Sequence, residues 1–129
     1  MPVIDQEIEG IDEFKNILHS AKISKNVVVL KFSANWCKPC KIAKPFIDAE
    51  ISKMSKNILF YTVDIDEQLD IYIKLKSKKM INGIPSLIAW YPNNKNIESE
   101  WYIIDNSVSG TNEAQIIGFF KQCNDIANK

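Results

Sequence analysis

The sequence lacks the features that mark several classes of protein. Its 16 basic residues are balanced by 16 acidic ones, so no excess of charge attracts it to nucleic acid or to an anionic membrane. No apolar run approaches the roughly 20 residues that a membrane-spanning helix requires. The first seven residues contain neither the basic nor the apolar part of a signal peptide. We therefore expect no nucleic-acid partner, no membrane association and a cytoplasmic location.

Cysteine and histidine are also scarce. The chain has three cysteines and one histidine, which is a poor basis for a framework of structural disulfides. Cys37 and Cys40 are only three positions apart, a spacing typical of a redox pair or of half a zinc site. Structural zinc takes about four ligands, and the remaining candidates, His19 and Cys123, lie far from the pair in sequence. The sequence therefore favours a redox pair, with no metal and no bound cofactor.

What is present is ordinary for a globular protein. The chain has 129 residues, of which 46% are hydrophobic and 25% charged. That length fits one domain, residues 1–129. Apolar residues recur at helical spacing in four segments, which we predict as helices: 11–21, 37–55, 69–75 and 114–126. Asp66 is a candidate cap for the third of these helices, and Thr111 or Asn112 for the fourth.

Short apolar runs rich in β-branched residues predict buried strands between these helices. They lie at 27–30, 58–63 and 87–91, with a weak edge strand near Val3 and Ile4. After the turn residues 92–96, segment 100–104 is expected to return as the partner of a hairpin. This order predicts an α/β fold with a central mixed sheet of about five strands flanked by four helices.

Residues 36–40, with the letters WCKPC, carry the clearest chemical signal. A thiol must ionise before it can attack a disulfide, and a free cysteine is mostly protonated at neutral pH. Cys37 is predicted to stand at a helix N-terminus, where unpaired N–H groups and the helix dipole favour a thiolate. Lys38 and Lys41 add positive charge nearby, and Pro39 suits an early helical position because its missing N–H costs nothing there. Each of these features favours an ionised Cys37.

The two cysteines are expected to differ in exposure. Cys37 precedes the helix and should face solvent, whereas Cys40 lies one turn inside and should be mostly buried. Cys37 would attack a substrate disulfide, and Cys40 would then attack Cys37 to release the reduced substrate.

The segment from Phe32 to Lys41, followed by Pro45, resembles the active-site strand end, loop and helix of the thioredoxin family. The segment Gly83–Ser86 is similar to the loop that carries that family's cis-proline, and Gly110 resembles the glycine before its last helix. The resemblance extends from about residue 8 to residue 127. It implies the thioredoxin fold and a thiol–disulfide oxidoreductase.

The resemblance also implies roles for the residues around the cysteines. Trp36 would pack beside the disulfide, Pro85 would be cis, and Ile84 would offer its backbone to a bound peptide. Lys38 and Pro39 would complete the substrate-contact surface. The implied partners are protein disulfides and an upstream dithiol donor similar to thioredoxin reductase, with the chain acting as a monomer.

Three departures from the family pattern are visible. Lys31 stands where thioredoxins commonly carry a buried aspartate, and their partnering lysine falls at Thr62 in this chain. Lys31 either extends to the sheet edge or is buried near the site, where with Lys41 it would modulate the thiols. Lys38 replaces the usual glycine between the cysteines. The third departure is a longer segment around 92–105, flanked by two tryptophans and two tyrosines that serve either strand packing or a partner surface.

We therefore expect a reductase of protein disulfides that contributes to electron transport and cell redox homeostasis. Two alternatives remain: a partner-binding module with little turnover, and a disulfide oxidase or isomerase. We also hypothesise that lysines near the cysteines form one basic face that favours acidic protein partners, namely Lys38, Lys41, Lys44, Lys74, Lys76, Lys78 and Lys79.

Overall fold

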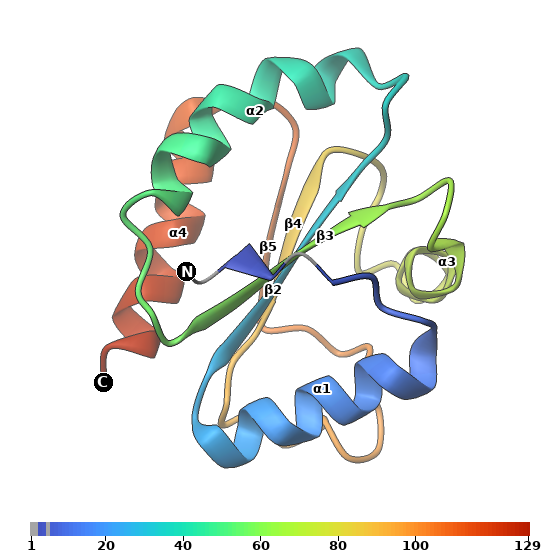
Figure 1. The fold of residues 1–129 in the computed structure, drawn as a ribbon, viewed down its shortest axis with the longest axis vertical. Coiled ribbons are helices and arrows are strands. Elements are labelled where there is room, and N and C mark those ends of the chain that lie inside the picture. Colours follow the sequence, from blue (N-terminus) through green and yellow to red (C-terminus); the bar gives the residue numbers. More distant parts are fainter. Residues whose placement is uncertain (1–2, 5) are drawn as a thin grey trace.

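The computed structural model describes residues 3–4 and 6–129 (Figure 1). The described elements follow in the order β1 (Val3–Ile4), α1 (Ile11–Ser24), β2 (Val27–Ser33), α2 (Lys38–Ile51), β3 (Ile58–Asp64), α3 (Leu69–Ser77), β4 (Ser86–Trp90), β5 (Asn106–Ser109) and α4 (Glu113–Ala127). In those residues, no helix is long and apolar enough to cross a membrane.

The strands form one mixed sheet in the order β1-β3-β2-β4-β5. β1 and β2 run parallel to β3, whereas β4 is antiparallel to β2 and β5 is antiparallel to β4. The predicted mixed sheet with four helices is confirmed, as is the short edge strand at Val3 and Ile4. β2 lies at the centre, which agrees with the uninterrupted apolar run at its start, residues 27–30.

Helices cover both faces of this sheet, as Figure 1 shows. Successive side chains of a strand point to opposite faces, so β2 contributes to two cores. Val28, Leu30 and Phe32 pack with residues of α1 and α3. Val27 and Val29 pack with residues of α2 and α4. This alternation also fixes where the polar end of β2 points, because Lys31 continues the row of Val27 and Val29.

The helix ends follow the sequence in most places. Gly10 precedes α1 with a φ of 106°, a conformation that favours glycine. Asn112 caps α4 through a 2.9 Å bond that its Oδ1 accepts from the Gln115 N–H, which settles the choice between Thr111 and Asn112.

One predicted strand is wrong. Segment 100–104 is not the hairpin partner of β4; that partner is β5, further along the chain. Residues 92–105 instead form a loop of turns that places Ile97 and Trp101 in the core, 4% and 5% exposed. Trp101 contacts Phe14 of α1, with 5.6 Å between ring centroids. The burial of this aromatic ring against a helix outweighed the strand propensity of its neighbours.

Candidate active site

The two paired cysteines lie where the central strand passes into a helix. β2 ends at Ser33, a short turn follows, and Cys37 is the N-cap residue of α2. Cys37 and Cys40 form a disulfide, with 5.3 Å between their Cα atoms. The Cys40 N–H donates a hydrogen bond to Cys37 Sγ over 3.2 Å. An otherwise unpaired N–H of the first helical turn therefore points at the sulfur that would carry negative charge after reduction.

The exposure predicted for Cys37 is wrong in this disulfide form. Cys37 is 3% exposed and Cys40 is 9% exposed, so both are buried. Cys37 belongs to a buried cluster that Ile84 packs against, and its Sγ accepts the Cys40 N–H of its own helix. The burial predicted for Cys40 is confirmed.

Trp36 lies directly before the cysteine pair, and its indole is hydrogen-bonded to a residue of another loop. Its side chain is among the exposed large apolar groups, at 67%. The indole Nε1–H donates to Asp66 Oδ2 over 2.9 Å, from the turn that follows β3. The prediction that Asp66 caps α3 is therefore wrong. That helix begins after Gln68 and has no side-chain cap. The two partners are 30 residues apart, so no local pattern in the sequence predicts this contact.

The Ile84–Pro85 loop lies at the same end of the sheet. The peptide bond between these residues is cis, as the resemblance implied. Ser86, the first residue of β4, pairs with Phe32 near the end of β2. Ile84 packs against the buried cluster that includes Cys37. The strand pairing thus brings the proline loop to the end of β2 from which the cysteine loop starts.

A hollow of about 330 Å³ lies on the other side of the disulfide. Cys40 lines it together with Lys31, Ser33, Ala34, Asn35, Lys41, Lys44, Thr62 and Asp64. Lys31 lies directly across from Thr62 in the register of β2 and β3, where the resemblance placed the two departures from the family pattern. Lys31 is half-buried and lines this hollow together with Cys40, so its position combines the two alternatives: the side chain lies near the site and reaches solvent beside the exposed Thr62.

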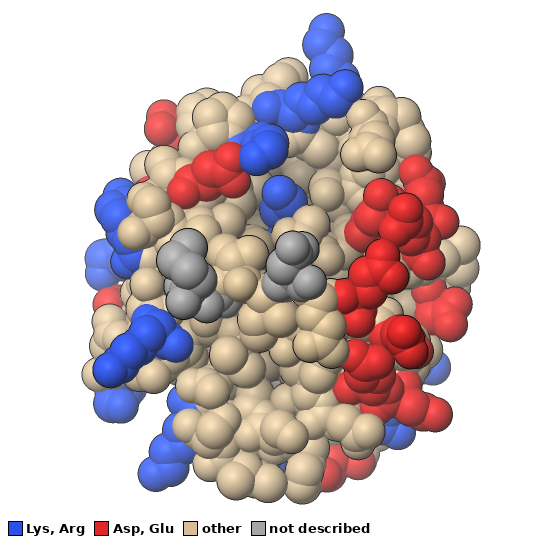
Figure 2. Space-filling model, viewed as in Figure 1, with Lys and Arg blue, Asp and Glu red and all other residues tan. Residues whose placement is uncertain are grey.

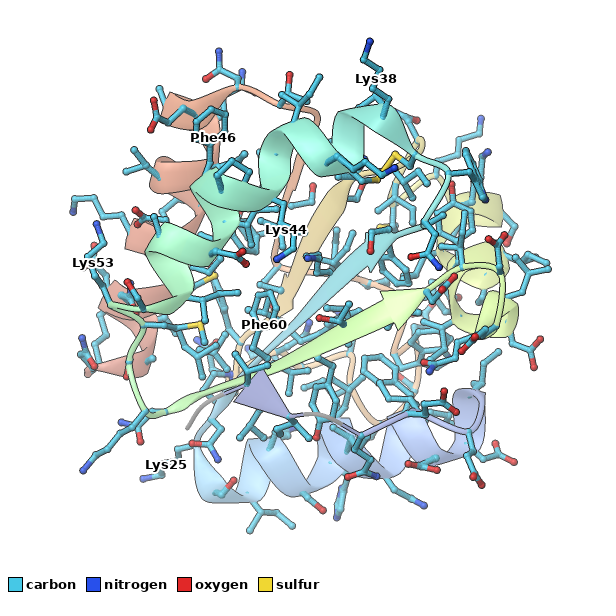
Figure 3. All side chains as sticks on the ribbon, turned by 45° about the horizontal axis from the view of Figure 1, so that its top comes forward. Lys25, Lys38, Lys44, Phe46, Lys53 and Phe60 are labelled. Atoms are coloured by element: carbon cyan, nitrogen blue, oxygen red, sulfur yellow. A yellow bond between two sulfur atoms is a disulfide. The ribbon has the colours of Figure 1, made fainter. Side chains whose placement is uncertain are left out.

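Burial lowers the pKa of Lys31 below its ordinary value. The carboxylate of Asp48 opposes this shift, and the positive charge of Lys44 adds to it. Lys44 itself forms an ion pair with Asp48 over 2.7 Å. Figure 3 shows Lys38 pointing away from the molecule at the first turn of α2, whereas Lys44 points back over the sheet. The lysines of this helix therefore face different surroundings.

Two lysines of the basic face that we hypothesised contact an aromatic ring. Lys74 of α3 and Lys78, directly after that helix, lie over the ring of Tyr102 in the 92–105 loop, with 5.3 and 4.9 Å to its centroid. Figure 2 shows acidic side chains gathered along the side of this view that α3 occupies in Figure 1, and lysines at its top. Acidic side chains also gather around Glu67, whose pKa is raised chiefly by the neighbouring carboxylate of Asp64 and then by that of Glu7.

The remaining candidates lie outside the site. Cys123 is fully buried on α4, where burial raises the pKa of its thiol to about 12. His19 is exposed and bonded through Nδ1 to Glu98 over 2.6 Å. In residues 3–4 and 6–129, no group of three or more histidine, cysteine or acidic side chains is placed to hold a metal ion.

Comparison with known proteins agrees with this geometry. The sequence model of the thioredoxin family matches residues 7–120. The chain belongs to the thioredoxin family. A redox pair with two residues between the cysteines, at the start of the helix after a central strand, is consistent with the thiol–disulfide oxidoreductase activity of that family. The family predicted from the residues is thereby confirmed.

Individual relatives extend the agreement. The chain is 40% identical to the thioredoxin of Oryctolagus cuniculus over 75 residues, which cover 58% of this chain and 69% of the rabbit protein. Among solved structures, the thioredoxin of Malassezia sympodialis superposes with a TM-score of 0.66 at 25% identity, over 96% of this chain and 95% of that one. The thioredoxin of Schistosoma mansoni shares the fold, with a TM-score of 0.64 at 24% identity, over 95% and 98%.

Proposed function

We propose that this thioredoxin-family chain is a reductase of protein disulfides in which Cys37 attacks and Cys40 resolves. The observation that carries the proposal is the position of Cys37 Sγ at the N-cap of α2, where it accepts the Cys40 N–H. A thiolate formed there gains both the hydrogen bond and the positive end of the helix dipole. Cys40 lies within bonding distance of it and needs no rearrangement of the helix to close the ring.

The cycle balances without a bound cofactor. The Cys37 thiolate attacks one sulfur of a substrate disulfide, so that a Cys37–substrate bond forms, the substrate S–S bond breaks and one substrate thiolate leaves. The Cys40 thiolate then attacks Cys37 Sγ, which forms the Cys37–Cys40 bond and releases the second substrate thiolate. Two electrons pass to the substrate, whose thiolates take protons from water.

Residues around the pair form the proposed substrate surface. Trp36 is exposed and braced by Asp66, and Lys38 and Pro39 are exposed on the first turn of α2. Ile84 is half-buried in the cis-proline loop, where its backbone would align with an extended peptide, and Pro85 would shape that loop. Because Cys37 is 3% exposed, an incoming dithiol must reach it through this rim.

The cellular setting is part of the same proposal. Both cysteines of the cycle come from one chain, which supports a single domain, residues 1–129, acting as a monomer. Continued turnover needs a dithiol donor, such as a flavoprotein similar to thioredoxin reductase, and a compartment that keeps thiols reduced. We therefore place the protein in the cytoplasm, in electron transport that maintains cell redox homeostasis.

Reduction of insulin disulfides with dithiothreitol tests the proposal. Wild type should accelerate the reaction, and Cys37→Ser and Cys40→Ser should not. Cys123→Ala is the matched control, since it removes a thiol that lies outside the site, and it should keep the activity. No acceleration by wild type would favour a partner-binding module. A redox titration then distinguishes a reductase from an oxidase or isomerase, because the reduction potential sets the direction of exchange.

A further inference from the structure

The hollow beside Cys40 contains a cation whose role the cycle does not explain. Lys31 is half-buried, but its ammonium group still contacts solvent, because no buried side-chain nitrogen of the described residues lacks a hydrogen-bond partner. Within the part of the chain that the structure describes, its ammonium group makes no ion pair or hydrogen bond with another protein group. The free cation and the resolving cysteine line the same hollow.

The alternation of the strands explains how this arrangement arises. Val27 and Val29 of β2 face the core beneath α2 and α4, and the next residue of that row is Lys31. On β3, Phe60 lies in the same core and Thr62 follows it in the row. Each row changes from apolar to polar as it passes under the first turns of α2. Lys31 and Thr62, the polar residues of these two rows, therefore line one hollow with Cys40.

Charges on every element around the hollow leave it positive. β2 contributes Lys31, β3 contributes Asp64, and α2 contributes Lys41 and Lys44. Three lysines and one aspartate give a net charge of two positive units among the lining residues. Lys44 is paired with Asp48 on its own helix, and Asp64 Oδ1 accepts a 2.9 Å bond from the Asp66 N–H. Lys31 is the lysine that lines the hollow from the sheet, whereas the other two lining lysines come from α2.

We propose that Lys31 is a positioning residue that stabilises the thiolate of Cys40 in the reduced protein. The inference rests on the proposed function, because it assigns an effect on the resolving step of that cycle. The Cys40 thiol gives its proton to water, and the resulting anion is stabilised by the Lys31 ammonium group across the hollow that both residues line. That anion then attacks Cys37 Sγ and displaces the substrate thiolate.

This assignment has a consequence for the direction of the exchange. A fixed positive charge stabilises the dithiolate form and leaves the neutral disulfide unaffected. It therefore raises the reduction potential, which makes the pair more oxidising than it would be with a neutral residue at position 31. Lys31 would act on both the rate of resolution and the potential.

The test is a titration of Cys40 alone, in the full chain carrying Cys37→Ser. Cys123 does not interfere, because its pKa of about 12 keeps it protonated across the range. The rate of alkylation by iodoacetamide is measured against pH, with and without Lys31→Met. We expect the midpoint for Cys40 to rise by about one pH unit, so that alkylation at neutral pH slows about tenfold.

Three controls separate charge from structure. Lys31→Arg keeps the charge and should keep the midpoint. Lys31→Gln removes the charge but keeps a polar end, and should reproduce the effect of Lys31→Met even if that variant folds poorly. Lys44 lines the same hollow but is already paired with Asp48. Lys44→Met should therefore move the midpoint by less than half as much. An unchanged midpoint in Lys31→Met and Lys31→Gln, or an equal shift in Lys44→Met, would overturn the proposal.

The titration uses no substrate and no turnover, so its result is independent of the insulin assay. Wild type that reduces insulin while Lys31→Met leaves Cys40 unchanged would refute the role of Lys31 and leave the reductase standing. A shifted midpoint with no insulin reduction by wild type would support the role of Lys31 and refute the reductase.

Discussion

The start of α2 and the loop of residues 92–105 are both connections that leave a strand of the central sheet, yet they are held in different ways. At the start of α2 the contacts are short in sequence: Cys40 N–H to Cys37 Sγ, and the disulfide between the same residues. In the loop they are long: the Trp90 indole donates to the Trp101 carbonyl over 2.6 Å, and Trp101 packs on Phe14 of α1. The first region is built for chemistry and the second for packing.

The difference teaches which substitutions each region should tolerate. A change at the cysteines should remove activity and leave the fold intact, because the helix and strand around them are held by the two cores. A change in the loop should lower stability and leave the chemistry intact, because the loop belongs to the core shared with α1. The predictions below test that separation.

The largest effect is expected for Cys40→Ser, which removes the resolving thiol. Turnover should fall on the order of 100-fold or more, because the mixed disulfide between Cys37 and the substrate is no longer released. That covalent complex should accumulate and be visible on a non-reducing gel. Cys37→Ser is the control, since it should lose turnover without forming the complex. Equal amounts of complex from both variants would show that the roles of the cysteines are assigned wrongly.

Trp101→Ala should have the largest effect on stability. Truncating this buried ring should lower the free energy of unfolding by about 3–5 kcal/mol, from lost burial and a cavity beside Phe14. Urea unfolding of the reduced protein measures this, and insulin reduction per folded molecule should change less than about twofold if the two regions are independent. Tyr102→Ala, a neighbouring aromatic that is only half-buried, is the control and should cost less. A large loss of activity in folded Trp101→Ala would show that the loop and the active site are coupled.

Asn94→Ala tests the polar side of the same loop. The Asn94 side chain is 5% exposed and donates to the Ile103 carbonyl and to Asp105 Oδ2, each over 2.9 Å. Asn94→Ala removes the donor of both part-buried hydrogen bonds, which should lower the free energy of unfolding by about 1–3 kcal/mol. The exposed neighbour Asn93 provides the matched control, since Asn93→Ala should change little. Equal stability of the two variants would mean that the hydrogen bonds of Asn94 do not stabilise the loop.

The smallest effect is expected for Asp66→Ala, which releases Trp36. The indole loses its 2.9 Å hydrogen bond but keeps its place in the chain, so the KM for insulin should rise about two- to fivefold with kcat nearly unchanged. Steady-state kinetics separate the two constants. Asp70→Ala removes an exposed carboxylate of α3 and controls for the loss of acidic charge on this side. A matching rise in KM there would assign the effect to charge alone.

The contrast between the regions also explains where the sequence was informative. The start of α2 could be read from its letters because capping, dipole and spacing act within one helical turn. The hairpin partner was placed at 100–104 because those residues favour a strand, whereas the structure pairs β4 with the less apolar β5. Asp66 was assigned as a cap from local pattern alone, and its bond to Trp36 spans 30 residues.

The sequence by itself determined the order of elements and the cysteine pair, since these depend on periodicity and on spacing over a few residues, and its motifs were enough for the resemblance to the family. Only the tertiary structure decided that Cys37 is shielded in the disulfide form, that Trp101 enters the core and that Lys31 and Cys40 line one hollow. The reason is physical: burial and electrostatics depend on which side chains from distant segments share a space. That is set by strand register and helix packing together.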